Sequence, residues 1–371
     1  MTDTEDDFFE GKRPWSIIKD QVLKDYMSPY LAKVKTLQKP IVLFDGYAGP
    51  GVFKDNEPGS PLIMCQAAEK NSPGKYKAYF VNKKKKYHDK LESILQKGGW
   101  YGPAKPILGD TTKILPTLPA EITDHTVFLY LDPFGPTGSP FSLLEPFLTR
   151  DKNYSTEMVI MMHMPVLHRL ASRKAVEAGR ENEAMIQRRH DRVTMTLGGD
   201  YWKPIMWDKS PMSTEEREKR LINAYVSKLA SYLPYAGCCP VREGPNKVTK
   251  YFIVFVSRHP DAMVIMNDAM IKAYFMRMHE DEWGGTLFAE TSWTEWLSTD
   301  GLDEVIIEEV RKTSGMTREE LWAQIVRKNF MKYRWSDFWP RVNKLIENNV
   351  LQSPTPRKQK RLNDTCTVFM R

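Results

Sequence analysis

Two short segments of the chain end a strongly apolar run in an aspartate that is followed by glycine and proline. Residues 41–44 (IVLF) lead into Asp45 and the loop GYAGPG, and residues 127–131 (VFLYL) lead into Asp132 and the sequence PFG. Glycine lets the backbone approach a ligand closely, so each segment has the composition of a strand that ends in a ligand-binding loop. The glycine spacing is not that of the dinucleotide-binding fingerprint, and no Gly-Lys-Ser/Thr of a P-loop follows it.

The first loop has the groups that S-adenosylmethionine requires. The carboxylate of Asp45 can accept a hydrogen bond from the ammonium of the methionine part, and the loop amides can face its carboxylate. The predicted cofactor contacts therefore include Gly46, Gly49 and Gly51. A structural turn explains these glycines equally well.

The ends of the next two expected strands give further cofactor candidates. Residues 77–81 end at Asn82, whose neutral amide would bind a ribose diol more weakly than an acid does. Residues 105–108 lead to Asp110, whose carboxylate can bond the adenine amino group. An N-cap of the following helix is the equally good alternative for Asp110.

The segment around Asp132 suits the methylation of an exocyclic amine. The Asp132 oxygen and a nearby carbonyl can hold the NH2 group and aim its lone pair at a methyl group, while Phe134 stacks on the base. Pro133 stiffens the strand end, and a transfer of this kind depends mostly on positioning. His163, after a later strand, can reach the same edge as a base or serve as a structural polar residue. A proline-braced turn without chemistry is the alternative for the whole segment.

Strand-length apolar runs alternate with helical patterns through the first half of the chain. The runs are continuous, as expected of strands covered on both faces, and the links are short, which favours a parallel, doubly wound sheet. We predict an α/β fold with a Rossmann-like, methyltransferase-type sheet over residues 41–290, after a helical segment at residues 1–40. Residues 163–245 predict a helical insertion that covers one edge of the sheet, and Pro29 is expected to kink or split the first helix.

Residues 301–371 have the pattern of a separate winged helix-turn-helix domain. Thr317 and Glu320 have the spacing of a capping box, Ser336 can cap a third helix, and two apolar runs can pair as a hairpin. The third helix of such a domain enters the major groove of DNA, although domains of this class also bind protein instead.

Positive charge is concentrated near the C-terminus. The net charge of the chain is +7, and residues 327–361 carry ten Lys or Arg against two Asp or Glu, a local balance of 10 − 2 = +8. A local basic patch favours a polyanionic partner over a solvated tail. The predicted nucleic-acid contacts are Arg341, Lys344, Arg357, Lys358, Lys360 and Arg361.

The overall composition is that of a globular protein, with 41% hydrophobic and 27% charged residues. No apolar run approaches the ~20 residues of a membrane helix, and the acidic N-terminus lacks an apolar signal core. The four cysteines have no metal-ligand spacing, so we expect no metal site. We therefore expect a reducing, cytoplasmic location without a membrane partner.

The segments FDGYAGPGVFKDNEPGSPL and LDPFGPTGSPFSLLE resemble the three-Cys-motif partner family, TcmP, over about residues 20–280. The resemblance implies a methyltransferase-like fold, a similar C-terminal winged helix and a radical-SAM-like three-Cys-motif protein as partner. The LDPFG stretch is also similar to tRNA guanine-N2 dimethyltransferases and, more loosely, to the DPPY loop of amino-methyltransferases. The second strand of the family ends in an acid, so Asn82 departs from the family pattern.

The sequence thus predicts an S-adenosylmethionine-dependent methyltransferase that acts on an exocyclic amine of a nucleic-acid base. One alternative is a binding protein on the same fold, without turnover, that docks nucleic acid or a partner enzyme; Asn82 and the absent DPPY tyrosine favour it. The other alternative is a nuclease in which Asp45, Asp110 and Asp132 converge on a divalent ion.

Overall fold

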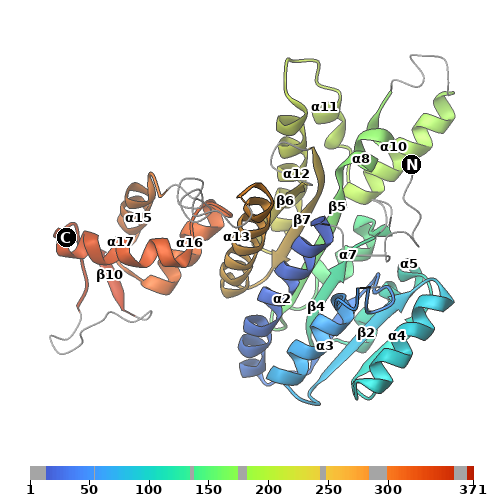
Figure 1. The fold of residues 1–371 in the computed structure, drawn as a ribbon. Coiled ribbons are helices and arrows are strands. Elements are labelled where there is room, and N and C mark those ends of the chain that lie inside the picture. The colour runs from blue at the N-terminus through green and yellow to red at the C-terminus, as the bar shows by residue number, and fades with distance from the viewer. Residues whose placement is uncertain are drawn as a thin grey trace. The chain divides into compact units, whose positions relative to one another are not determined.

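The computed structural model describes residues 14–53, 55–133, 138–173, 182–242, 248–283, 299–354 and 366–371 (Figure 1). The chain divides into two compact units, Met1–His259 and Pro260–Arg371, which are described separately. This division falls earlier than the boundary near residue 290 that the sequence suggested.

Helices and strands alternate along the first unit. Its elements are α2 (Pro14–Val34), η1 (Lys35–Leu37), β1 (Ile41–Asp45), α3 (Ser60–Asn71), β2 (Tyr76–Asn82), α4 (Lys85–Lys97), β3 (Ala104–Leu108), α5 (Thr111–Ile114), η2 (Leu115–Thr117), α6 (Leu118–Glu121), β4 (Thr126–Leu131), α7 (Phe141–Leu148), β5 (Thr156–His163), α8 (Met164–Ala171), α10 (Glu183–Leu197), α11 (Trp202–Met206), α12 (Thr214–Ala230), β6 (Tyr235–Arg242) and β7 (Thr249–Ser257).

Seven strands form one sheet in the order β3-β2-β1-β4-β5-β7-β6. The strands β3, β2, β1, β4 and β5 are all parallel to one another. Asp45, the last residue of β1, lies beside Phe80 of β2 on one side and Tyr130 of β4 on the other. Strand β7 is antiparallel to both of its neighbours. The chain runs from β1 outward to β3 and returns to β4 on the other side of β1, so the topological switch point lies between β1 and β4. The predicted doubly wound, Rossmann-like α/β sheet is confirmed.

Strand β4 shows why these strands read as continuous apolar runs. Val127, Leu129 and Leu131 point into the core that the sheet shares with α7, α8, α10 and α12. Phe128 points to the opposite face, where its ring stacks on Tyr26 of α2 with 5.8 Å between ring centroids. Helices α2 and α3 pack together in this unit (Figure 1). Both faces of the strand are therefore covered, and both must be apolar.

The interpretation of residues 163–245 as a helical insertion at one edge was wrong in two respects. Helices α10 and α12 lie on a face of the sheet, because Val193 and Tyr225 are buried in its core. In addition, the last part of the segment forms β6, an edge strand that pairs with β7. Gly237 and Pro240 obscured this strand in the sequence, but an edge strand tolerates a proline since one side of it has no ladder to complete.

Helix α2 continues through Pro29, so of the two outcomes expected at this residue the split does not occur. Pro29 is exposed, whereas Tyr26 and Tyr30 on either side of it are buried. Tyr30 also contacts Phe128, with 5.4 Å between ring centroids. Packing against the sheet thus outweighs the backbone hydrogen bond that the proline removes.

The second unit contains four helices and three short strands in its described part. These elements are α13 (Pro260–Trp283), α15 (Leu302–Arg311), β8 (Met316–Thr317), α16 (Arg318–Lys328), α17 (Trp335–Glu347), β9 (Leu351–Gln352) and β10 (Thr367–Met370). The strands form a small sheet in the order β8-β10-β9, and both of its pairings are antiparallel.

The predicted capping box at the start of α16 is confirmed. The backbone N–H of Glu320 donates to the Thr317 hydroxyl over 3.2 Å, and the N–H of Thr317 donates to the Glu320 carboxylate over 2.8 Å. The predicted cap at Ser336 was wrong, because α17 begins one residue earlier. There the N-cap is Arg334, whose backbone N–H donates to Asp337.

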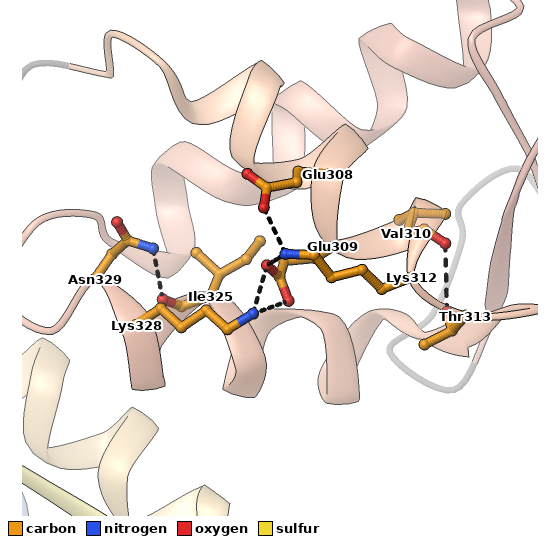
Figure 2. A network of polar contacts seen from close by, with 8 residues as sticks. All are labelled: Glu308, Glu309, Val310, Lys312, Thr313, Ile325, Lys328 and Asn329. Carbon is orange, nitrogen blue, oxygen red and sulfur yellow. Dashed lines mark hydrogen bonds and ion pairs between the residues drawn. The ribbon is translucent and has the colours of Figure 1, made fainter.

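A buried acid joins α15 to α16 (Figure 2). Glu309 of α15 accepts hydrogen bonds from Lys328 of α16 at 2.7 Å and from Lys312 at 2.9 Å. Burial would raise the pKa of Glu309, but these two lysines outweigh it and the pKa lies below its ordinary value. The pair of helices is therefore held by a carboxylate with two cationic partners.

Asn267 attaches α13 to the rest of the second unit. Its side chain donates to the carbonyl of Tyr333 over 2.9 Å and accepts from the N–H of Met331 over 2.8 Å. Asn267 and Tyr333 are both fully buried, so water cannot replace the amide at the Tyr333 carbonyl.

We predict that Asn267→Ala destabilises the second unit by about 1–3 kcal/mol, because it leaves the buried C=O of Tyr333 unpaired and removes the partner of the Met331 N–H. Urea unfolding combined with hydrogen-exchange mass spectrometry measures the loss and locates it. Asn343→Ala on α17 is the control, and equal effects of the two substitutions would contradict the assignment.

Candidate functional site

The two glycine-containing loops meet at the switch point of the sheet. The N–H of Gly46, directly after β1, donates to the carbonyl of Tyr130 in β4 over 3.0 Å. The hydroxyl of Tyr47 donates to the carbonyl of Gly138, beyond the end of β4. Burial raises the pKa of Tyr47 to about 12, so its hydroxyl remains a donor at neutral pH. The sequence expected both loops at one edge, and this contact brings them together.

Asp45 is fully buried and holds the first loop in place. Its Oδ1 accepts from the N–H of Tyr47 over 2.9 Å, and its Oδ2 accepts from the hydroxyl of Ser60, the first residue of α3, over 2.6 Å. Burial raises its pKa from 3.8 to about 7; the two hydrogen bonds offset only part of this, and Asp132 and Asp20 add to it. No cationic side chain within the described ranges pairs with Asp45.

The glycines of the loop are required by its conformation and packing. Gly49 and Gly51 have φ angles of 63° and 82°, in the left-handed region that favours glycine. A Cβ on Gly46 would lie 2.8 Å from Cγ2 of Thr111 and 3.0 Å from Cδ2 of Leu131. These constraints come from the chain itself, so they do not by themselves indicate a ligand.

The amides of the same loop do indicate a ligand. The N–H of Ala48 is bonded to the carbonyl of Val81, but no partner is found among the described residues for the N–H of Gly49 or of Gly51. Both glycines are buried. Two buried donors without acceptors, close to a buried acid without a cation, fit a ligand that carries both a carboxylate and an ammonium.

Asn82 supports the loop at the end of β2. Its Nδ2 donates to the carbonyl of Gly49 over 2.8 Å, and the side chain is buried. A carboxylate at this position has no proton to donate to that carbonyl. The departure from an acid at Asn82 therefore has a structural reason, which the sequence did not reveal.

Asp110 is the N-cap of α5. It accepts from the N–H of Thr112 over 3.0 Å and forms an ion pair with Lys83 over 2.8 Å. The hydrogen bond from Lys83, followed by those from Thr112, lowers the pKa of Asp110 to about 2. The capping alternative thus describes what Asp110 does in this structure.

Asp132 has a partner that the sequence did not suggest. Its Oδ2 pairs with the ammonium of Lys19, which belongs to α2 and lies 113 residues earlier in the chain. The ammonium also lies 5.2 Å from the ring centroid of Tyr251. Pro133 is buried beside Asp132, and Phe134, the predicted stacking residue, lies outside the described residues. Only the tertiary fold reveals Lys19, because nothing in the local sequence of a helix signals such a contact.

His163 lies near this pair at the end of β5. Burial lowers its pKa, which the carboxylate of Asp132 opposes and the ammonium of Lys19 reinforces. Its ring packs 5.6 Å from the ring of Tyr251, measured between centroids. A neutral imidazole at neutral pH follows from this environment.

The three aspartates do not form a metal site. Among the residues that the structure describes, no group of three or more His, Cys, Asp or Glu side chains is placed to hold a metal ion. Asp45 is enclosed by its own loop, and Asp110 and Asp132 are each paired with a lysine. The nuclease alternative is therefore not supported.

The predicted nucleic-acid contacts of the C-terminal unit differ in their surroundings. Arg341 is partly buried and donates to Asp303 over 3.3 Å and to Thr299 over 2.9 Å, whereas Lys344 is exposed. The other four lie outside the described residues, namely Arg357, Lys358, Lys360 and Arg361. Residues 299–354 carry nine basic and nine acidic side chains, so their net charge is 9 − 9 = 0.

Comparisons with known proteins give only distant structural matches. No protein-family model matches the chain, and no curated protein matches it. A solved O-methyltransferase TomG from Streptomyces achromogenes, in complex with SAM, is 14% identical with a TM-score of 0.35, and the match covers 65% of this chain and 80% of that one. An O-methyltransferase from Bacillus cereus, in complex with SAH, is 11% identical with a TM-score of 0.33 over 63% and 79% of the two chains.

An RNA methyltransferase from Salinibacter ruber, in complex with S-adenosyl-L-homocysteine, is 18% identical with a TM-score of 0.24 over 36% and 73% of the two chains. Scores this low carry no information on cofactor or substrate. Within the described residues, no helix has the length and apolar character that crossing a membrane requires.

We predict that Asp45→Asn removes a pH-dependent loss of stability. Since the folded chain holds the Asp45 proton up to a pKa of about 7, against 3.8 ordinarily, the folded state binds more protons than the unfolded state between these values. The stability of the native protein relative to the variant should fall as pH rises from about 4 to about 7, by on the order of 1–4 kcal/mol. Urea unfolding at four pH values measures this, with the exposed Asp191→Asn as control; a pH-independent difference contradicts it.

We also predict that Gly46→Ala destabilises the first unit by about 1–3 kcal/mol, because its Cβ would overlap Thr111 and Leu131. Gly102→Ala, where a Cβ would meet nothing within 4 Å, should change stability by less than about 0.5 kcal/mol. Denaturant unfolding of both variants gives the comparison, and similar costs at the two positions would show that the loop has room for a side chain.

Proposed function

We propose that this protein is an S-adenosylmethionine-dependent methyltransferase that acts on an exocyclic amine of a nucleic-acid base. The observation that carries the proposal is the meeting of the two loops at the switch point between β1 and β4. Ligands of open α/β sheets bind at the carboxyl ends of the strands at such a point. Asp45 ends β1 and Asp132 directly follows β4, the two strands that flank it.

The residues of the first loop suit the methionine part of the cofactor. The unpaired amides of Gly49 and Gly51 would hold the carboxylate. Asp45 would attract the ammonium through its charge while keeping the loop in shape, and Asn82 would act through its bond to Gly49. When bound, the cofactor supplies a methyl group made electrophilic by a sulfonium.

The second loop suits the acceptor. One oxygen of Asp132 is held by Lys19, and no hydrogen bond to Oδ1 is found in the part of the chain that is described. Asp132 is partly exposed, with 20% of its side-chain surface accessible. Its Oδ1 would accept an N–H of the amine and fix the direction of the nitrogen lone pair. Phe134 would stack on the base.

The C-terminal unit would supply affinity for nucleic acid. We interpret α15, α16 and α17 with the small sheet β8-β10-β9 as a winged helix-turn-helix, in which α17 is the third helix. The exposed Lys344 and the basic residues Arg357, Lys358, Lys360 and Arg361 would contact phosphates. Arg341 would instead keep α17 in place through Asp303.

A binding protein without turnover is the second candidate, and specific contacts favour it. Asn82 is used by Gly49 and Asp132 by Lys19, so two expected ligand-binding groups already have partners in the chain. In this case the chain would dock nucleic acid or a radical-SAM-like three-Cys-motif protein, as the resemblance to TcmP implies.

We predict that the purified protein binds S-adenosylhomocysteine with micromolar affinity in calorimetry and transfers tritiated methyl groups to DNA or RNA. Asp132→Asn should reduce transfer by about 100-fold while changing the affinity for S-adenosylhomocysteine by less than about two-fold, because the amide is a poorer acceptor but lies outside the cofactor loop. Thermal unfolding confirms that the variant is folded.

The control for this experiment is Asp191→Asn, an exposed residue of α10 that should leave transfer unchanged. Unchanged transfer by Asp132→Asn would contradict the role of Asp132. Salt-dependent binding of DNA or RNA by a folded protein that binds no S-adenosylhomocysteine would establish the second candidate instead.

A further inference from the structure

A lysine is buried at the point where the substrate amine would bind. Lys19 has 6% of its side-chain surface accessible, and its ammonium pairs with Oδ2 of Asp132. Lysine is almost never this buried unless it is paired. The side chain reaches the strand ends from α2, a helix that otherwise packs on the sheet through aromatic residues such as Tyr26.

The surroundings of the ammonium hold it in this position. Its contact with the face of Tyr251 in β7 is a cation–π interaction, which is strongest when the cation is shielded from water. Tyr251 is itself fully buried. The Lys19–Asp132 pair is thus built into the end of the sheet from three elements, α2, β4 and β7.

The Lys19–Asp132 pair changes which amines can bind at Oδ1 of Asp132. A carboxylate alone attracts cations, and protonated alkyl amines would bind it best. With the Lys19 ammonium against Oδ2, the pair itself has no net charge, and a second cation at Oδ1 would lie beside a like charge. This lowers the attraction for a cation relative to an unpaired Asp132, on top of the constant field of Asp20 and Asp45, which act on the same strand end. A neutral amine meets no such repulsion and still finds an acceptor in Oδ1.

We propose that Lys19 is a positioning and specificity-determining residue: it holds Oδ2 of Asp132, leaves Oδ1 for the N–H of a neutral amine, and excludes cationic amines. This inference rests on the proposed function. It restricts the substrate class to amines that are uncharged at neutral pH, such as the exocyclic amines of nucleobases, and excludes alkylammonium groups of proteins and small molecules.

The test uses two ligands of the cofactor site and needs no turnover. Sinefungin is an analogue of S-adenosylmethionine that carries a protonated amine in place of the transferable methyl group, and S-adenosylhomocysteine lacks that group. Calorimetry gives the affinity ratio of the two ligands for the native protein and for Lys19→Met, Lys19→Arg and Lys24→Met. Lys24, exposed on the same helix, provides the matched control.

Lys19→Met should tighten sinefungin relative to S-adenosylhomocysteine by about ten-fold or more, since it leaves the carboxylate without its cation. Lys19→Arg and Lys24→Met should keep the native ratio. If the Lys19–Asp132 ion pair serves only to join α2 to the end of β4, Lys19→Met should lower the thermal stability but leave the affinity ratio of the two ligands unchanged. That result would overturn the inference.

Asp132→Asn provides an independent variant if Lys19→Met does not fold. It removes the carboxylate that pairs with the ammonium of Lys19, so sinefungin should weaken by about ten-fold relative to S-adenosylhomocysteine. If Lys19→Met and Asp132→Asn both leave the affinity ratio unchanged while S-adenosylhomocysteine still binds, the role of Lys19 is refuted but the proposed function is not. Failure of the native protein to bind either ligand refutes the proposed function, and the role of Lys19 with it.

Discussion

The carboxylate of Asp45 joins the end of β1, the turn at Tyr47 and the first turn of α3 at Ser60. Because the carboxylate is buried, water does not compete for these two hydrogen bonds. They fix the backbone of the glycine loop against α3. The same loop is also held by the hydrogen bond of Gly46 to Tyr130 and by that of Asn82 to Gly49. The positions of the unpaired loop amides, and hence the candidate ligand site, depend on this one group.

The negative charges of the three strand-end aspartates are compensated in different ways. Asp110 pairs with an exposed lysine, Asp132 pairs with a buried lysine, and Asp45 has hydrogen-bond donors but no cation. The least accessible of the three therefore has the least stabilised carboxylate, which is why burial raises the pKa of Asp45 to about 7. A cationic group of a ligand near the first loop would meet this carboxylate, whereas a group near Asp132 would meet a neutral pair that offers a hydrogen-bond acceptor.

The C-terminal unit is held together by polar contacts between its own elements. Glu309 joins two helices through two lysines (Figure 2). Arg341 bonds Asp303, and Asn267 fixes α13 through backbone groups. Its charges cancel over residues 299–354, so this part of the unit generates no long-range attraction for a polyanion. The basic residues in the interval 357–361 would supply most of that attraction in the proposed nucleic-acid complex.

The sequence by itself determined the elements that depend on local pattern and burial. The strand positions, the doubly wound sheet, the two loops after Asp45 and Asp132, and the capping box at Thr317 all follow from hydrophobic periodicity and turn or cap chemistry within a few residues. The sequence failed for β6, whose Gly237 and Pro240 conceal a strand that only the neighbouring β7 makes possible. The split that it allowed at Pro29 also does not occur, because packing on Phe128 overrides the local preference.

The tertiary structure alone decided how the candidate site residues are used. Lys19 reaches Asp132 across 113 residues of sequence, and Asn82 turns its amide to the carbonyl of Gly49. Contacts of this kind leave no periodic or motif signal, because they depend on where helices and strands lie after folding. The sequence therefore identified the strand ends that bear the chemistry, and only the fold showed which of their polar groups are already engaged and which remain able to bind a ligand.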